Sequence, residues 1–119
     1  MVDSILASVK QLLNVEQSIT AFDAELIMHI NAALAELIQS GIGPDEGFLI
    51  DENTEWSEFT EDARMISNSL EYVYCKTKLI WDPPANSFTC DALKSRAEEC
   101  YWRAYITANE NKSQNGSEG

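Results

Sequence analysis

A histidine close to a carboxylate can bind a metal ion or transfer a proton, and this chain has one such pair. His29, the only histidine, follows Glu25 by four residues, which places both side chains on one face of a helix. A zinc or di-metal site needs further histidines or clustered carboxylates at ligand spacing, and the sequence has none. We therefore interpret His29 as an ordinary surface or core-edge histidine.

Glu98, Glu99 and Cys100 form the other group that could do chemistry. Adjacent residues of a helix point about 100° apart, so the two carboxylates cannot easily hold one ligand. The sequence also lacks a glycine-rich phosphate loop, a serine elbow and a Cys/His pair at a family spacing. We predict a solvated helix face here, in a protein that is not an enzyme and has no catalytic, cofactor-binding or metal-binding residues.

The cysteines Cys75, Cys90 and Cys100 are odd in number and contain no Cys-x-x-Cys pair. Free cysteines of this kind usually pack as small hydrophobes. The first residues form neither a basic nor an apolar leader segment, and no stretch approaches about 18 apolar residues. We expect a cytosolic protein with reduced, buried or half-buried cysteines and no membrane contact.

Two segments in the first part of the chain have apolar residues at helical spacing. The first covers residues 5–13 and can be capped by Asp3 or Ser4. The second has apolar residues from Leu26 to Ile38 after Thr20-x-x-Asp23, and Gly41 follows it where a left-handed C-terminal cap is needed. Both are predicted to be amphipathic helices of one domain, because 119 residues is the size of a single domain.

The helical pattern breaks between Gly41 and Trp56. Glycine and proline in Gly41-Ile-Gly-Pro44 mark a turn, and the triplet Phe48-Leu-Ile50 is too short for more than a brief extended piece pinned to the core. We predict one long structured loop over about residues 41–56, and loops of this length often carry function.

Asp82-Pro83-Pro84 is predicted to be a structural hinge between a third and a fourth helix. Two prolines offer no amide hydrogen and push the residue before them toward extended geometry, so the third helix must end by Asp82. That helix should begin between Ser57 and Asp62, with an inward stripe of Ile66, Leu70, Val73, Thr77 and Ile80. The fourth should be capped by Ser87 or Thr89, with an inward stripe of Leu93, Ala97, Cys100, Tyr101 and Ala104.

The last segment, residues 109–119, contains no apolar residue and cannot repay the entropy of ordering by burial. The predicted fold class is therefore all-α. It is a compact bundle of about four helices with the long structured loop, formed as a single domain by residues 1–108. A disordered, flexible polar tail is predicted over 109–119.

The fourth helix carries large apolar residues on a second side, opposite the Cys100 stripe. A helix with two apolar sides usually has two packing partners. In a small domain the second partner is either the first helix or another subunit, and both remain open at this point. Trp102, Tyr105 and Ile106 lie on this second side, and together with Tyr101 of the inward stripe they are the candidate interface residues.

The formal net charge of −12 is concentrated in one part of the chain. No Lys or Arg occurs from Gln11 to Ala63, and the acids in that segment are Glu16, Asp23, Glu25, Glu36, Asp45, Glu46, Asp51, Glu52, Glu55, Glu58, Glu61 and Asp62. Such a field repels phosphates, which argues against wrapping of nucleic acid by charge neutralisation.

The sequence resembles the head-to-tail connector, or adaptor, proteins of tailed phages and prophages, over about residues 4–103. The carriers are motifs in a characteristic order: Ile5-Leu-x-Ser-Val-Lys-x-Leu-Leu13, Phe22-Asp-x-Glu-Leu-Ile-Met-His-Ile-Asn31, Gly41-Ile-Gly-Pro44 with Gly47-Phe48, Trp56-Ser-Glu-Phe59, Tyr72-Val-Tyr-x-Lys76, Asp82-Pro-Pro-x-x-Ser-Phe88 and Glu99-x-x-Trp-Arg103.

This resemblance implies a structural, all-α protein that assembles with neighbouring copies of itself as a ring, of about twelve subunits, beneath the portal protein. The ring extends the DNA channel, lets DNA pass without specific binding, and offers a platform to a stopper or tail-completion protein. It implies a location in the virion neck, and in the host cytoplasm during assembly. Related adaptors use peripheral or terminal segments to grip the portal, so the segment after Tyr101 and the tail are candidates for that contact.

An acid-rich stretch without bases would repel a sliding phosphate backbone. We therefore hypothesise that part of the 45–62 segment faces the channel or its mouth, with Asp45, Glu46, Asp51, Glu52, Glu55 and Glu58 as candidate channel-facing acids. The main alternative is a small acidic interaction protein, a DNA mimic or inhibitor that binds a basic partner. An enzyme with an unusual site is a more distant alternative.

Overall fold

The computed structural model describes the backbone of residues 4–118 and the side chains of residues 4–111. The chain forms five helices, α1 (Ile5–Leu12), α2 (Asp23–Gln39), α3 (Trp56–Phe59), α4 (Ala63–Trp81) and α5 (Ser87–Glu118). The described residues contain no strand beyond one isolated antiparallel bridge between Ser4 and Glu55. The all-α prediction is confirmed, with the short α3 as a helix more than expected.

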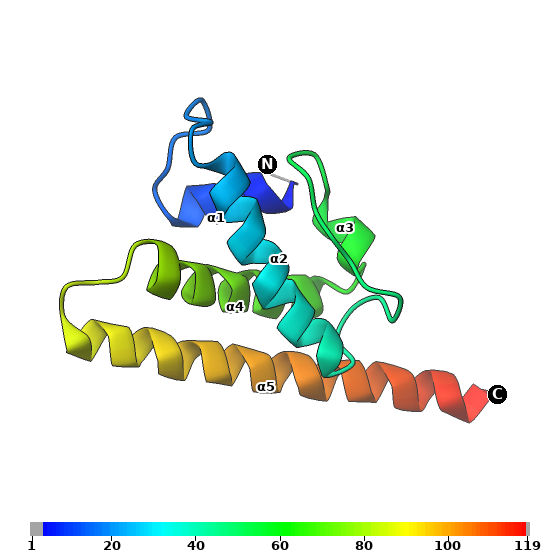
Figure 1. Cartoon of the computed structure of the whole chain (residues 1–119). Coiled ribbons are helices and arrows are strands. Elements are labelled where there is room, and N and C mark those ends of the chain that lie inside the picture. Colours follow the sequence, from blue (N-terminus) through cyan, green and yellow to red (C-terminus); the bar gives the residue numbers. More distant parts are fainter. Residues whose placement is uncertain (1–3, 119) are drawn as a thin grey trace.

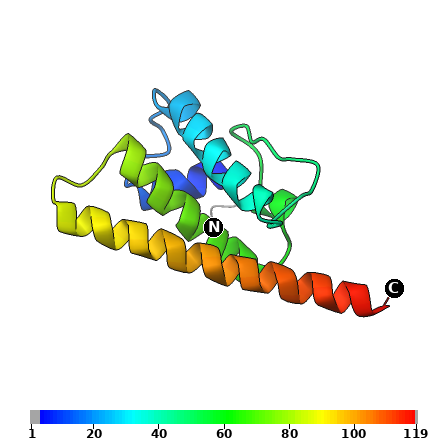
Figure 2. The same ribbon diagram turned by 60° about the horizontal axis from the view of Figure 1, so that its bottom comes forward.

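Helix α4 lies between two layers of the molecule (Figure 1). Helices α1 and α2 pack on one side of it, and α5 runs antiparallel along the other side, as the turned view also shows (Figure 2). The corner between α4 and α5 lies at one end of the molecule, and the loop that contains α3 lies at the other. This arrangement separates the predicted hinge from the predicted acidic loop.

The core changes character from one layer to the other. On the side of α1 and α2 it is built from large aliphatic residues, among them Ile5, Leu26, Ile30 and Leu34, each with no exposed surface. On the inner face of α5 it is built from small residues, because Ala97, Cys100, Ala104 and Ala108 are all buried. The predicted small stripe of the fourth helix is therefore confirmed, and small side chains let α5 approach α4 closely.

The predicted inward stripe of α4 is partly wrong. Val73 and Thr77 are buried and Ile66 and Leu70 are half-buried, but Ile80 is 62% exposed. Because α4 is covered on two sides, it buries a wider set of residues than a single stripe, which also includes Met65, Ser69, Tyr72 and Cys75.

The ends of the helices follow local rules with one correction. The Ser4 hydroxyl caps α1 by accepting from the Ala7 amide at 3.0 Å, and Gly41 adopts the left-handed conformation, φ 87°, after α2. Helix α5, however, is capped by Asn86 and not by Ser87 or Thr89. The Asn86 side-chain oxygen accepts from the backbone amides of the second and third residues of the helix, at 2.7 and 3.2 Å.

Helix α5 continues past Ala108, where the sequence predicts the start of a flexible tail. Ala108 is buried, and the side-chain amide of Asn111 donates to the Asp62 carboxylate at 3.2 Å. This contact with the start of α4 joins residues 109–111 to the domain, and the helical backbone runs on to Glu118. Residue 119 lies outside the described residues, and the division of the chain at 108 stays a prediction.

The loop between α2 and α4 is structured, as predicted, because distant residues bind it at both ends. The Trp56 indole nitrogen donates to the Ser8 hydroxyl at 2.9 Å, and the Ile5 amide donates to the Thr54 carbonyl at 2.8 Å. At the other end, the Ile50 amide donates to the side-chain oxygen of Asn31 on α2 at 2.9 Å. The loop is therefore attached to both α1 and α2.

Lys10 joins α1 to the start of α2, although it is only 2% exposed. Its ammonium group donates to the Asp23 carboxylate at 2.8 Å and to the carbonyls of Ile19 and Gln17 at 2.6 and 3.3 Å. A buried charge is tolerated when it is paired and hydrogen-bonded in this way. The contact fixes the connection between the two helices.

We predict that Gly43→Ala destabilises the protein more than Gly47→Ala, although both glycines have φ 95°. A β-carbon at position 43 would lie 2.5 Å from the Phe59 ring, whereas one at position 47 would meet no atom within 4 Å. The left-handed backbone costs both variants about 1–2 kcal/mol, and overpacking adds about 1–3 kcal/mol at position 43 alone. Urea unfolding measures the difference, and equal losses would contradict this packing of the loop.

Candidate functional site

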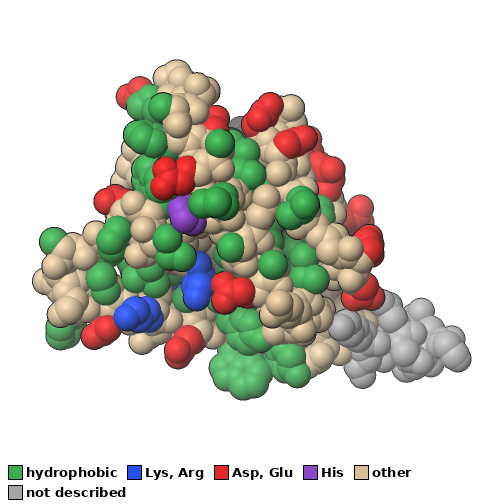
Figure 3. Space-filling model, viewed as in Figure 1, with side chains coloured by type: hydrophobic (Ala, Val, Ile, Leu, Met, Phe, Trp, Pro, Cys, Tyr) green, Lys and Arg blue, Asp and Glu red, His purple; other side chains and the backbone are tan. Residues whose placement is uncertain are grey.

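Four residues of α5, Tyr101, Trp102, Tyr105 and Ile106, form a continuous apolar surface that we call the α5 aromatic face. Trp102 is 60% exposed and Ile106 52% exposed, while the two tyrosines are half-buried. The rings of Tyr101 and Tyr105 are stacked with centroids 6.5 Å apart, and Trp102 lies 5.4 Å from Tyr105. Hydrophobic side chains gather along this edge of the molecule, over the middle of α5 (Figure 3). Helix α1 does not cover this side of α5.

A groove of about 450 Å³ opens between α4 and α5 beside this face. Its lining, which we call the α4/α5 groove, is formed by Tyr72, Lys76, Leu79, Lys94, Ala97, Glu98, Tyr101 and Trp102. The lining combines aromatic rings with charged groups, as protein interfaces commonly do. Sequence reasoning identified the aromatic residues of this region and missed the groove, because its two walls come from helices far apart in sequence.

The tyrosines at the base of the groove are held in place. Tyr72 is buried and its ring lies 5.9 Å from that of Tyr101, whose hydroxyl contacts the hydroxyl of Ser40 at the end of α2. Burial, together with the charge of Glu36, raises the pKa of Tyr72 to about 12. Tyr72 is therefore neutral at physiological pH, and the groove has a rigid aromatic floor.

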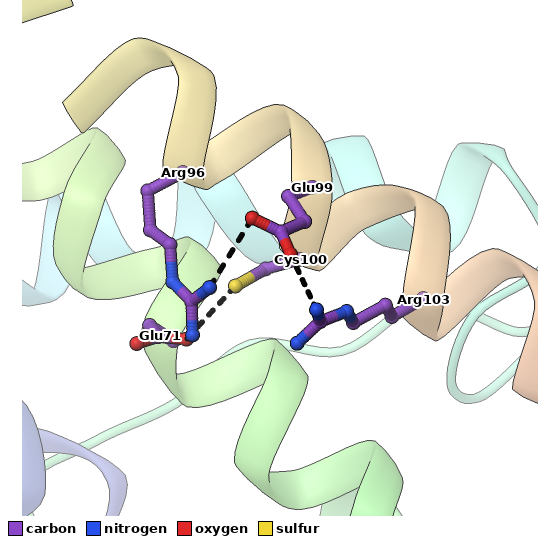
Figure 4. Close-up of polar contacts among 5 residues, drawn as sticks. All are labelled: Glu71, Arg96, Glu99, Cys100 and Arg103. Carbon is purple, nitrogen blue, oxygen red and sulfur yellow. Dashed lines mark hydrogen bonds and ion pairs between the residues drawn. The ribbon is translucent and has the colours of Figure 1, made fainter. Parts of the chain in front are cut away.

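A polar network joins α4 to α5 along the small-residue side of α5 (Figure 4). Glu71 on α4 accepts from Arg96 at 2.6 Å and from the Cys100 thiol at 3.0 Å. On α5 itself, Glu99 pairs with both Arg96 and Arg103. The predicted solvated face is thus confirmed for exposed Glu98, whereas exposed Glu99 belongs to this network.

The contacts within the network shift the pKa values of Glu71 and Cys100. The hydrogen bond from Arg96 holds the pKa of Glu71 below its ordinary value. Burial, followed by the hydrogen bond to Glu71, raises the pKa of Cys100 to about 12. A thiol with so high a pKa is not a nucleophile at neutral pH. The group therefore forms a polar clamp between α4 and α5.

The six candidate acids, Asp45, Glu46, Asp51, Glu52, Glu55 and Glu58, are all exposed on the loop before α3 and in its first turn. Acidic side chains line the corresponding edge of the molecule (Figure 3). Two of the acids also shape the backbone. Asp51 accepts from the Asn53 amide at 2.8 Å, which lowers its pKa, and Glu58 accepts from the Glu55 amide at 2.8 Å.

A second hollow, of about 570 Å³, lies where this loop passes α2. Its lining, which we call the loop groove, is formed by Ala35, Ile38, Gln39, Glu46, Gly47, Phe48 and Leu49. Leu49 is 80% exposed, while the neighbouring Phe48 packs edge-on against Phe59 with ring centroids 5.4 Å apart. The predicted apolar triplet is therefore divided, with Ile50 in the core and Leu49 at the surface.

The corner at Asp82, Pro83 and Pro84 ends α4 as predicted. The last helical residue is Trp81, and α5 starts at Ser87 in the antiparallel direction. Asp82 accepts from the Lys78 ammonium at 2.7 Å, and the Cys90 thiol contacts the Pro84 carbonyl at 3.4 Å. These local contacts fix the direction in which α5 leaves the corner.

His29 has the setting of an ordinary core-edge histidine. Its Nε2 lies 3.8 Å from the Glu25 carboxylate, and its side chain is 16% exposed. Among the residues that the structure describes, no three His, Cys, Asp or Glu side chains are grouped closely enough to hold a metal ion. No helix within the same part of the chain is long and apolar enough to cross a membrane.

A scan against protein-family models connects these surfaces with a known class of protein. The model for the phage connector protein matches residues 5–111, which include all five helices up to the contact of Asn111 with Asp62. The chain belongs to the phage connector protein family. No curated protein and no solved structure matches it.

Membership in the family gives this connector protein a structural role in joining the phage head to the tail. It places the protein in the neck of the virion and implies contact with other head or tail proteins. The resemblance noted from the sequence is therefore confirmed at the level of the family. A connector works through its surfaces, which makes the α5 aromatic face, the two grooves and the acidic loop its candidate functional regions.

We predict that the unfolding free energy of the connector falls less between neutral and acid pH in Glu71→Gln than in the wild type. Because the pKa of Glu71 is lowered in the folded state, its contribution is present above the ordinary carboxyl value and is lost as pH falls through the lowered value. Unfolding free energies at about pH 5 and about pH 2 should therefore differ less in Glu71→Gln than in the wild type. Exposed Glu98→Gln is the matched control and should behave as the wild type. An unchanged pH dependence in Glu71→Gln would contradict the clamp.

Proposed function

We propose that this connector protein assembles as a ring of about twelve copies beneath the portal, extends the DNA channel, and offers a docking platform to a stopper or tail-completion protein. The observation that carries the proposal is the α5 aromatic face. Trp102 and Ile106 are more than half exposed on a helix whose opposite side, with Ala97 and Cys100, is already buried.

The energetics of this face support an interface. An isolated exposed apolar residue needs no explanation, but contiguous apolar patches usually mark contacts with a partner. Tryptophan and tyrosine are the residues that most often dominate binding energy at interfaces, because they bury a large area at little conformational cost. The stacked tyrosines hold the surface in shape before binding.

The charge distribution supports the passage of DNA through the proposed ring. The loop and α3 present acids to solvent, and no base occurs in the chain from residue 11 to 63. A wall of this kind repels a phosphate backbone and does not trap it. We assign the part of the segment around Asp51, Glu52, Glu55 and Glu58 to the channel or its mouth. A DNA mimic would instead need acids spaced along one elongated face, whereas here they crowd one loop.

The end of α5 is a candidate for the grip on the portal. Its backbone continues as helix to Glu118, past the contact of Asn111 with Asp62, so residues 112–118 extend the same helix that carries the aromatic face. Deletion from residue 112 onward keeps the Asn111 contact with Asp62 and should weaken portal binding in a pull-down. Undiminished binding would exclude the extension from the portal contact.

We predict that Trp102→Ala lowers affinity for the cognate portal or for neighbouring copies by about tenfold or more. Because the Trp102 side chain is 60% exposed in the wild type, the unfolding free energy of the Trp102→Ala variant should stay within about 0.5 kcal/mol of the wild-type value. Met28→Ala, at a residue on α2 that is 61% exposed, is the matched control. Sedimentation with and without the portal measures the affinity, and urea unfolding measures the stability. Wild-type assembly by Trp102→Ala would count against the proposed function.

We also predict that cryo-electron microscopy of the portal-bound connector places Glu52 and Glu55 at the channel wall or its mouth. Both are exposed acids of the 51–58 stretch, and the Glu52 side chain forms no hydrogen bond or ion pair among the described residues. Double substitution to Gln should leave folding unchanged and make the channel less repulsive to DNA. Location of the whole stretch on the outer rim would overturn the assignment.

A further inference from the structure

Two hollows with apolar side chains in their linings lie on different parts of the surface that the structure describes. One is the α4/α5 groove beside the aromatic face, and the other is the loop groove against α2. Each has a protruding apolar side chain at its edge, Trp102 at the first and Leu49 at the second. The projecting side chain of one such surface can therefore enter the hollow of another surface on a second copy.

The charges around the two hollows are of different kinds. Every base except buried Lys10 follows Ala63 in the sequence, and Lys76 and Lys94 line the α4/α5 groove together with Glu98. Lys94 is exposed and forms no ion pair among the described side chains. The loop groove has Glu46 in its lining and Asp45 beside it, both exposed, and no Lys or Arg occurs in the chain from residue 11 to 63.

These charges select the pairing. Two loop grooves facing each other would bring Asp45 and Glu46 of both copies together, and like charges across an interface are costly. The loop groove therefore needs a partner surface that carries bases, and in this chain only α4 and α5 supply exposed bases to the described surface. A contact between two different surfaces of identical subunits is heterologous, which is the kind that closes into rings.

From these observations we infer that adjacent connector copies pack head to tail, with Trp102 of one copy seated in the loop groove of the next, beside Leu49. Lys94 of the first copy then lies opposite Glu46 of the second. This inference rests on the proposed ring and says which surfaces build it. It assigns Asp45 and Glu46 to the contact between subunits, and leaves the acids from Asp51 to Glu58 for the channel.

Cross-linking between two differently labelled variants tests the contact. Gln39 lines the loop groove, and Ser95 is an exposed residue two helical turns before Trp102 on the same side of α5. Gln39→Cys and Ser95→Cys are made in full-length chains that carry Cys90→Ser. The remaining thiols, Cys75 and Cys100, are buried, and burial raises their pKa to about 11 and about 12, so they react slowly. The variants are bound to the cognate portal, separately and mixed, and treated with a short bismaleimide.

Head-to-tail packing predicts cross-linked dimers in the mixture and none with either variant alone. Adding Trp102→Ala to the Ser95→Cys chain should lower the yield by about tenfold. Dimers from Ser95→Cys alone would indicate two α5 faces in contact and would overturn the inference. So would the absence of dimers from a mixture that still binds the portal, and in that case the proposed function would stand. Failure of the wild-type chain to bind the portal would instead contradict both the proposed function and the inferred contact between subunits.

Discussion

The close packing of α5 on α4 is the constraint on which the remaining structure depends. Ala97, Cys100, Ala104 and Ala108 give α5 a face of small side chains, and Glu71 of α4 ties the two helices together through Arg96 and the Cys100 thiol. Small residues permit the approach but leave no space for large rings. The large aromatic side chains of α5 must therefore lie outside this seam, where they line a groove and an exposed face. The chemistry of the protein's surface follows from the packing of its interior.

Much of the fold could be predicted from local sequence signals. The helical spacing before Gly41, the two prolines after Asp82 and the small stripe of α5 each depend on residues close together in the chain. Apart from the local cap of α5 by Asn86, the misses involve partners far apart in the sequence. Lys10 is buried because Asp23 and two carbonyls of the next connection surround it, and α5 continues because Asn111 meets Asp62, 49 positions away. Helix α4 buries a wider set of residues than one stripe because it is covered on two sides, by α1 and α2 and by α5, which no stripe in its own sequence reveals.

The candidate surfaces could be predicted from the sequence only where their residues lie close together in the chain. Trp102 and Ile106 stand out because they lie opposite the Cys100 stripe on one helix. The grooves do not, since each has walls from two separate segments. The uneven charge can be seen in the sequence, and the structure adds that the acids from Asp45 to Glu58 are exposed on one loop and in the first turn of α3, while the exposed bases among the described residues lie on α4 and α5. For a family of connectors, this division gives one subunit two unlike surfaces.

The central claim is that the protein is a ring-forming adaptor on a portal. Native mass spectrometry of the full chain, with and without the portal protein of the same phage, tests it most directly. The account predicts a complex that contains the portal ring and a complete ring of connector copies, whether or not the connector assembles by itself. A portal ring that never retains the connector would contradict it.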